Sequence, residues 1–232
     1  MTTAYRLVPF GAGAPAPVAD VTRLHVTLLP ASPVSLLGVR FVKNFYYRVL
    51  PHEGLMLGAV AYVDEQPAGF VAATHDRDGF LRSALRKRWP QAAWAVGTSV
   101  LTAPKSGAAV WQAWRVMHSR RPAEAGEAAG EILSLGVLPA YREPRFVRQS
   151  GLHIATDLVE VAVGELRKLG IQHISAAVRA DNTEAKLFYA GLGWRLHGTS
   201  ALGWGPVAVE FIWRRAGNFT AQEEISASPV RR

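Results

Sequence analysis

An apolar run, a basic stretch and an amphipathic helix follow one another between residues 131 and 170, and this order limits the folds open to the chain. Residues 131–138 have the composition of a buried strand, and apolar residues at helical spacing run from Gly151 to Leu169, where Gly170 ends the pattern. The stretch between them begins with Pro139 and holds three arginines: Arg142, Arg145 and Arg148. Free N–H groups at a helix start, a glycine and nearby arginines suit a diphosphate. The segment therefore predicts an anion site at a strand-to-helix connection.

Strand and helix patterns alternate through the rest of the chain. The segments with regular periodicity are a helix over 33–50, a hairpin of strands 57–63 and 68–74, a strand over 171–178, a short helix over 182–190 and a strand over 207–213. This order predicts the α/β class, with an α+β mixed sheet. We assign residues 1–215 to one domain with a helical insert at about 76–130, and residues 216–232 to a flexible C-terminal tail.

The composition excludes several classes of protein. With 232 residues, 49% hydrophobic and 19% charged, the chain is long and apolar enough to bury a core. It contains no cysteine, so disulfides, thiolate metal sites and a thiol nucleophile are absent. No apolar run reaches the roughly 18 residues that a spanning helix needs, and the N-terminus lacks the order of a signal peptide. We therefore expect a cytoplasmic protein.

The formal charge of +8 is concentrated in one segment. Residues 77–121 carry nine lysines or arginines against Asp78 alone, together with four tryptophans, and the rest of the chain is balanced. The pattern favours two basic amphipathic helices. Three roles stay open for them: covering the sheet or a neighbouring subunit in a homodimer, docking on an anionic membrane surface as a peripheral protein, or contacting nucleic acid. The high apolar content makes nucleic acid the least favoured partner.

Two motifs resemble those of the GNAT superfamily of acetyl-CoA-dependent N-acetyltransferases. The first resembles its diphosphate loop, Arg/Gln-x-x-Gly-x-Gly/Ala, and consists of Arg148, Gln149, Ser150 and Gly151, preceded by Val137, Pro139, Tyr141 and Arg142. It departs from the family pattern in two places, because residues 143–148 intervene after Arg142 and His153 replaces the second small residue. The second resembles the closing motif and consists of Asn182, Ala185, Phe188, Tyr189, Gly193 and Trp194. Both motifs occur in the family's order.

The resemblance implies a GNAT-like acyl-CoA N-acyltransferase fold, with acetyl-CoA as acetyl donor and no metal. It implies that the central strand splays after about Leu135 to Val137, where Gly136 suits a bulge. Asn182 would cap the short helix, and the small Ala185 would leave room for the cofactor chain. The residues implied in cofactor binding are Leu135, Gly136, Val137, Arg142, Arg148, Gln149, Ser150, Gly151, Leu152, His153, Asn182, Ala185 and Phe188.

The same resemblance assigns catalytic roles. Tyr189 would act as the general acid, because a phenol with a pKa of ~10 is protonated at neutral pH and can donate to a departing thiolate. The alternative is a core aromatic beside Phe188. Glu131 is the best candidate for the base, acting through a water, although a carboxylate at a strand edge is also commonly just solvated. His25, His52 and His75 are weaker candidates.

The expected reaction is direct attack by a primary amine on the acetyl thioester, without an acyl-enzyme. An amino sugar or another small metabolite is favoured as the acceptor, and a protein N-terminus, a polyamine and a small toxic amine stay open. Two other functions compete with this enzyme: a non-catalytic acyl-CoA-binding module, and a peripheral membrane or nucleic-acid interaction protein that acts through the basic insert.

Overall fold

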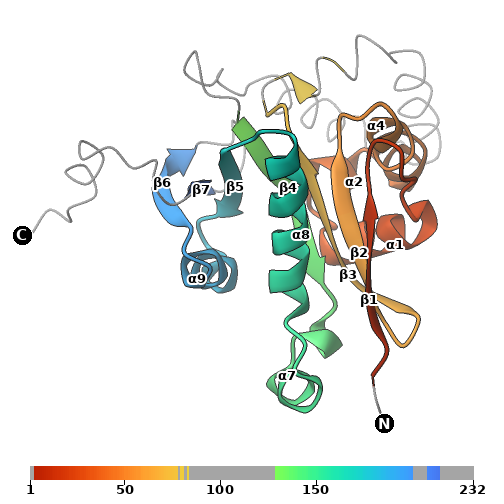
Figure 1. Cartoon of the computed structure of the whole chain (residues 1–232), viewed down its shortest axis with the longest axis vertical. Coiled ribbons are helices and arrows are strands. Elements are labelled where there is room, and N and C mark those ends of the chain that lie inside the picture. The colour runs from red at the N-terminus through yellow and green to blue at the C-terminus, as the bar shows by residue number, and fades with distance from the viewer. Residues whose placement is uncertain (1–2, 78, 81–82, 84–128, 201–207, 215–232) are drawn as a thin grey trace, which may run out of the picture.

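The computed structural model describes residues 3–77, 79–80, 83, 129–200 and 208–214. It contains a seven-stranded sheet in the order β1-β2-β3-β4-β5-β7-β6, in which β4 and β5 are parallel and the other neighbours are antiparallel (Figure 1). The strands are β1 (Tyr5–Phe10), β2 (Leu57–Val63), β3 (Gln66–Thr74), β4 (Ala129–Val137), β5 (His173–Arg179), β6 (Arg195–Ser200) and β7 (Ala208–Arg214). The mixed sheet confirms the predicted fold class.

The hairpin of β2 and β3 and the two later strands β5 and β7 lie close to their predicted positions. The hairpin turn uses Asp64 and Glu65, both with positive φ, which matches the right-handed twist of the flanking strands. Two strands, β1 and β6, were not predicted. β6 is made of exposed residues from Arg195 to Thr199, so its sequence carries little of the apolar alternation that identifies a strand.

One face of the sheet is covered by α8 (Ile154–Lys168), which lies in front of the strands in Figure 1. Its buried residues, which include Ile154, Leu158, Ala162 and Leu166, share a hydrophobic core with the facing side chains of β2 to β5 and β7. The apolar stripe at helical spacing thus buries the helix on the sheet. This arrangement sets the start of α8 beside the end of β4, where the diphosphate site is predicted.

The opposite face carries α1 (Val18–Leu28) and the segment after it. We predicted one helix over residues 33–50, and this prediction is wrong. The chain instead forms α2 (Pro33–Leu36), α3 (Val39–Phe41), the π-helical η1 (Val42–Tyr46) and α4 (Val49–His52). Gly38, at φ 95°, interrupts the helical path after α2. Tertiary burial of Phe41, Phe45 and Tyr47 replaces the continuous helix that the spacing suggested.

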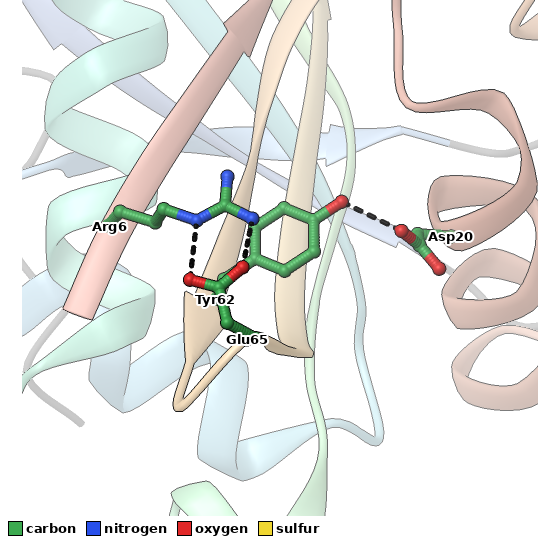
Figure 2. A network of polar contacts seen from close by, with 4 residues as sticks. All are labelled: Arg6, Asp20, Tyr62 and Glu65. Atoms are coloured by element: carbon green, nitrogen blue, oxygen red, sulfur yellow. Dashed lines mark hydrogen bonds and ion pairs between the residues drawn. The ribbon is translucent and has the colours of Figure 1, made fainter. Parts of the chain in front are cut away.

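A polar network fixes α1 to the β1–β2 edge of the sheet (Figure 2). Arg6 of β1 forms two hydrogen bonds with Glu65 and lies 4.1 Å from the ring centroid of Tyr62. The Tyr62 hydroxyl donates to Asp20 in the first turn of α1 at 2.8 Å, and burial and this hydrogen bond raise the pKa of Tyr62 to about 12. A cation, an aromatic ring and a carboxylate thus connect the sheet to the helix.

Most of the predicted basic insert and all of the predicted tail lie outside the described residues. The described part of the insert belongs to the folded body: Phe80 is buried and packs edge-on against Tyr46, with the ring centroids 6.5 Å apart. Among the helices that the structure describes, none is long and apolar enough to cross a bilayer.

Candidate active site

The two parallel strands at the centre of the sheet separate before they end. β4 and β5 pair from Ala129↔His173 to Ile132↔Ala176, whereas β4 runs on to Val137 and β5 to Arg179. We call this separation beyond Ile132 and Ala176 the split. The pairing ends three residues before Leu135, where the splay was expected. All three predicted β4 contacts to the cofactor, Leu135, Gly136 and Val137, therefore lie along the split.

A bulge accompanies the split, but it is not at Gly136. In the β3–β4 register, Ala72 pairs with Ser134 and Ala73 with Ile132, which leaves Leu133 as the extra residue. Gly136 pairs regularly with Phe70. A side chain at position 136 would come within 2.9 Å of Leu28 Cδ1, so the glycine serves the close approach of α1.

The predicted arginine-rich loop is largely helical. Residues Pro144–Ser150 form α7, with Pro144 at the first position, and Gly151 ends it at φ 71°. The N–H of Gly151 donates to Val147 O, and the Ser150 hydroxyl donates to Phe146 O and accepts from the Leu152 N–H. These groups of Ser150 and Gly151 are engaged in closing α7. The inserted residues after Arg142 thus appear as an extra helical turn before the diphosphate loop.

The start of α8 has the free backbone N–H groups that the predicted anion site requires. His153 precedes the helix without a side-chain cap, and the first intrahelical bond runs from Asp157 N to His153 O. The N–H groups of the first turn, from Ile154 to Thr156, therefore have no intrahelical acceptor. With the helix dipole they favour a diphosphate. Exposed cationic and polar side chains precede this turn: Arg142, Arg145, Arg148 and Gln149.

The second motif forms α9 (Thr183–Gly191), which follows β5. The Asn182 side chain accepts a hydrogen bond from Ala185 N at 3.0 Å, which confirms its prediction as the helix cap. Phe188 and Tyr189 project from α9 onto the core shared with α8. The ring of Tyr189 also packs 4.9 Å from Trp194, so the final glycine and tryptophan of the motif bring the chain back to the tyrosine.

Tyr189 lies at the beginning of the split. Its ring stacks on Phe211 of β7 with centroids 5.9 Å apart, and Phe211 pairs in register with Ala176, the last β5 residue that pairs with β4. Only 5% of Tyr189 is exposed, and burial raises the pKa of its phenol. Among the described residues, its hydroxyl is not one of the fully buried oxygens that lack a hydrogen-bond partner. The residue is thus a core aromatic beside the split whose phenol stays protonated at neutral pH.

Glu131 lies at the same level on the other face of the sheet. Its neighbours Gly130 and Ile132 face the α8 core, so the carboxylate points away from α8. It pairs with Thr74 of β3 and Ser175 of β5, and only 3% of it is exposed. Tyr189 and Glu131 are the residues predicted as acid and base. They lie on opposite faces of the sheet, both close to the last β4–β5 pairs.

The sequence analysis missed a second acidic residue on the face of Glu131. Glu210 of β7 lies between Val209 and Phe211, which face the α8 core, so its side chain points to the opposite face. It forms an ion pair with Arg77, and both side chains are largely buried. Arg77 follows β3, which β4 and β5 separate from β7 in the sheet, so the ion pair links two segments that are not neighbours in the strand order. The sequence signal that could have revealed Glu210 is a single charged residue between the apolar residues of a predicted strand.

The three histidine candidates are placed differently: His75 directly follows Thr74, the β3 register partner of Glu131, whereas His25 and His52 have other surroundings. His25 is fully buried in α1, with Nδ1 2.6 Å from the Tyr47 hydroxyl and Nε2 3.1 Å from Ser32 Oγ. Burial lowers its pKa to about 4, so it is neutral at physiological pH. His52 is 82% exposed beside Glu53. Neither environment is that of a base directed at the split.

Two hollows differ in their relation to the candidate residues. A cavity of about 340 Å³ lies between α1, the β2–β3 turn and the exit of β4, lined in part by Arg23, Leu138 and Tyr141. A larger one of about 480 Å³ lies at the far end of α8, beside Arg167 and Trp213. The smaller hollow includes Tyr141 of the first motif, whereas the larger one lies away from both motifs, and none of the residues expected to bind the cofactor or to act in catalysis lines either hollow. We therefore assign the candidate site by the split and Tyr189, not by a cavity. Within the described ranges, no three His, Asp or Glu side chains are grouped to hold a metal ion.

Comparisons with known proteins agree with this geometry. Residues 28–194 match the Acetyltransferase (GNAT) family. A mycothiol acetyltransferase from Geodermatophilus obscurus is 32% identical over 104 residues, which is 44% of this chain and 27% of that relative. The alignment thus spans about a quarter of the relative's length.

Solved structures show the same fold at low identity. The NatC complex bound to Gag peptide and CoA gives a TM-score of 0.53 at 16% identity, over 93% of this chain and 99% of that chain. Arabidopsis thaliana NAA60 with a bisubstrate analogue gives 0.52 at 15% identity, over 92% and 98%. Since the family match covers well over half of the sequence, the chain belongs to the Acetyltransferase (GNAT) family.

Proposed function

We propose that this protein transfers the acetyl group of acetyl-CoA to a primary amine by direct attack, with Tyr189 as the general acid. The observation that carries the proposal is the position of Tyr189 beside the last β4–β5 pair, where its ring stacks on Phe211. A donor lying along the split would bring its sulfur to this tyrosine. The raised pKa of the buried phenol keeps the proton available at neutral pH.

The residues along the split fit the donor. Acetyl-CoA supplies the acetyl group as a thioester on a pantetheine arm that ends in a diphosphate. The N–H groups of Ile154 to Thr156 would receive the diphosphate, with Arg142 and Arg148 adding charge. Beyond Ile132, the β4 edge that faces β5 has no ladder partner in β5, so its backbone can bind the amides of the arm. Ala185 and Phe188 of α9 would line the other side.

The two faces of the sheet would serve different substrates. The α8 face holds the uncapped helix start and Tyr189, so the donor and its leaving sulfur belong there. The opposite face holds Glu131, which would take the proton of the attacking amine through a water. The amine nitrogen bonds to the acetyl carbon as the carbon–sulfur bond breaks, and Tyr189 gives its proton to the sulfur. The β4 backbone N–H groups beyond the bulge would stabilise the oxyanion.

A small metabolite amine, such as an amino sugar, is the acceptor class we favour. The relative with 32% identity is named for mycothiol, although the alignment covers 27% of its length. NatC, which was solved with a peptide, is 16% identical and supports the fold alone. The face of Glu131 also presents Ser175, Arg77 and Glu210. Hydroxyl, cationic and anionic groups together suit a polar, hydrogen-bonding acceptor.

The test is an acceptor screen that measures thiol release from acetyl-CoA. The panel contains amino sugars, polyamines, amino acids and peptides with free N-termini, and each active amine is verified by the mass of its acetylated product. We expect turnover with a small polar amine that is lost in Tyr189→Phe. Turnover confined to the peptides would contradict the acceptor class, and CoA binding without turnover of any amine would contradict the reaction.

A cytoplasmic location, a homodimer and docking of residues 77–121 on an anionic membrane belong to the same proposal. The segment combines nine basic residues with four tryptophans, and most of it lies outside the described residues. Co-sedimentation with anionic and neutral vesicles tests the membrane contact. Equal recovery of the protein in the supernatant with both kinds of vesicle would contradict the proposed membrane contact.

A further inference from the structure

An ion pair joins the two sides of the split at its open end. Arg142 Nη1 donates to Glu184 Oε1 at 2.5 Å. Arg142 follows β4 through the short 3₁₀ helix η3 (Pro139–Tyr141), and Glu184 lies in the first turn of α9, which follows β5. The backbone ladder between these strands ends at Ile132 and Ala176. Arg142 and Glu184 therefore meet across the end that the donor's diphosphate must approach.

The contacts around Arg142 anchor the segment between β4 and α8 on the core that α8 covers. The rings of Tyr141 and Phe146, on either side of Arg142 in sequence, pack edge-on with centroids 5.2 Å apart. Both rings pack against the core that contains Ile154, the first residue of α8. Arg142 is thus one of the exposed cations that lie between β4 and α8 along the chain. In the structure, its charge is opposed by a carboxylate.

We propose that Glu184 is a residue of the acetyl-CoA site: its carboxylate holds Arg142 across the open end of the split and yields it to the diphosphate of CoA. This inference rests on the proposed function. A diphosphate offers several oxygens to Arg142 and also accepts from the N–H groups of α8, so it replaces one carboxylate contact with several. Once displaced, Glu184 lies near like charge, and the carboxylate lowers the affinity for CoA.

The pair is suited to this exchange because it is weak. The side chains of Arg142 and Glu184 are 42% and 74% exposed, and ion pairs between exposed groups are weak and screened by salt. The helix that carries Glu184 does not depend on the pair, because the Asn182 side chain caps it. Removing the carboxylate should therefore change binding without unfolding α9.

The test compares the affinity for CoA by calorimetry in wild type and Glu184→Gln, with Glu165→Gln as the matched control. Glu165 also pairs with a cation on an exposed helix surface, at 2.7 Å from Lys168, but at the other end of α8. We expect Glu184→Gln to bind CoA about two- to fivefold more tightly, the range that an exposed pair can supply, and Glu165→Gln to bind as wild type does. Glu184→Lys should bind more tightly still, and 0.5 M salt should shrink the gain.

The same substitution, made in a protein that already lacks the Arg142 guanidinium, shows whether Glu184 lowers the affinity for CoA through Arg142. In Arg142→Gln, the further change Glu184→Gln should recover less than it does in wild type, because the pair is already broken. Equal or weaker CoA binding by Glu184→Gln would overturn the inference, and weaker binding would show that the pair must stay closed over the bound donor. If wild type itself binds no CoA, the proposed donor site fails as well. If wild type binds CoA and Glu184→Gln matches the control, the role of Glu184 alone fails.

Discussion

The ring of Tyr189 lies on Phe211, whose register partner Ala176 is the last residue of β5 to pair with β4. One stacking contact thus ties the orientation of the phenol to the point where the central strands part. The tyrosine is buried, and its ring contacts with Phe211 and Trp194 position it. The position of the proposed acid is therefore a property of the core.

Tyr189→Phe should separate packing from chemistry. The ring and its contacts with Phe211 and Trp194 stay, so the melting temperature should change little, whereas kcat should fall by about 10²-fold or more because the proton donor is lost. Steady-state thiol release and thermal unfolding measure the two effects. Unchanged kcat in Tyr189→Phe would show that Tyr189 takes no part in the chemistry.

The raised pKa of Tyr189 also predicts that wild-type kcat shows no loss from phenol ionisation up to pH 10.

Glu131→Gln should act on the pH dependence of the reaction. If Glu131 takes the amine proton, kcat/KM near neutral pH should fall by about 10²-fold, and the loss should diminish at alkaline pH as more amine becomes neutral by itself. Glu165→Gln is the control, because Glu165 is a carboxylate on an exposed helix surface at the far end of α8. Identical pH profiles for both variants would show that position 131 has no special role as base.

The Arg77–Glu210 ion pair should contribute to stability. Either single change, Arg77→Met or Glu210→Gln, leaves one largely buried partner without its counter-charge, so unfolding should become easier by about 1–3 kcal/mol. The double variant should lose less than the sum of the single losses. Urea denaturation of the four proteins gives the coupling energy. Strict additivity would mean that the contact does not stabilise the fold.

His25 predicts a loss of stability in acid. Its pKa is about 4 in the folded protein and about 6.5 in the unfolded chain, so the unfolded state binds more protons between these values. Stability should be full above pH 6.5 and fall as the pH is lowered, by about 3 kcal/mol when pH 4 is passed. Urea midpoints measured from pH 7.5 to pH 4 should decline less steeply in His25→Gln. The exposed His197→Gln should keep the wild-type slope, and an unchanged slope in His25→Gln would contradict this origin.

Elements with strong periodicity could be predicted from the sequence, and those decided by tertiary contact could not. The hairpin, α8 and β5 follow from apolar patterns, and Asn182 follows from the chemistry of helix caps. The segment after Ser32 has helical spacing, but Gly38 and burial on the sheet divide it into short pieces. β6 has almost no buried face that its sequence could reveal.

The sequence predicted which residues belong to the candidate site, but not where they lie relative to one another in the fold. The motifs indicated Arg142, Gly151 and Tyr189, but no local pattern shows that the bulge falls at Leu133 or that Arg142 meets Glu184. Both depend on strand register and on segments far apart in the sequence. Gly136 was assigned to the bulge because glycine is common there, whereas the approach of Leu28 explains it.

The parallel pairing of β4 and β5 also affects how the protein is synthesised. β4 can add to β3 as soon as it emerges from the ribosome, but its other edge waits until α8 and then His173–Ala176 have followed. During that interval an apolar strand edge is open to other chains. A nascent chain stalled before His173 should therefore require a chaperone, whereas one extended past β7 should not.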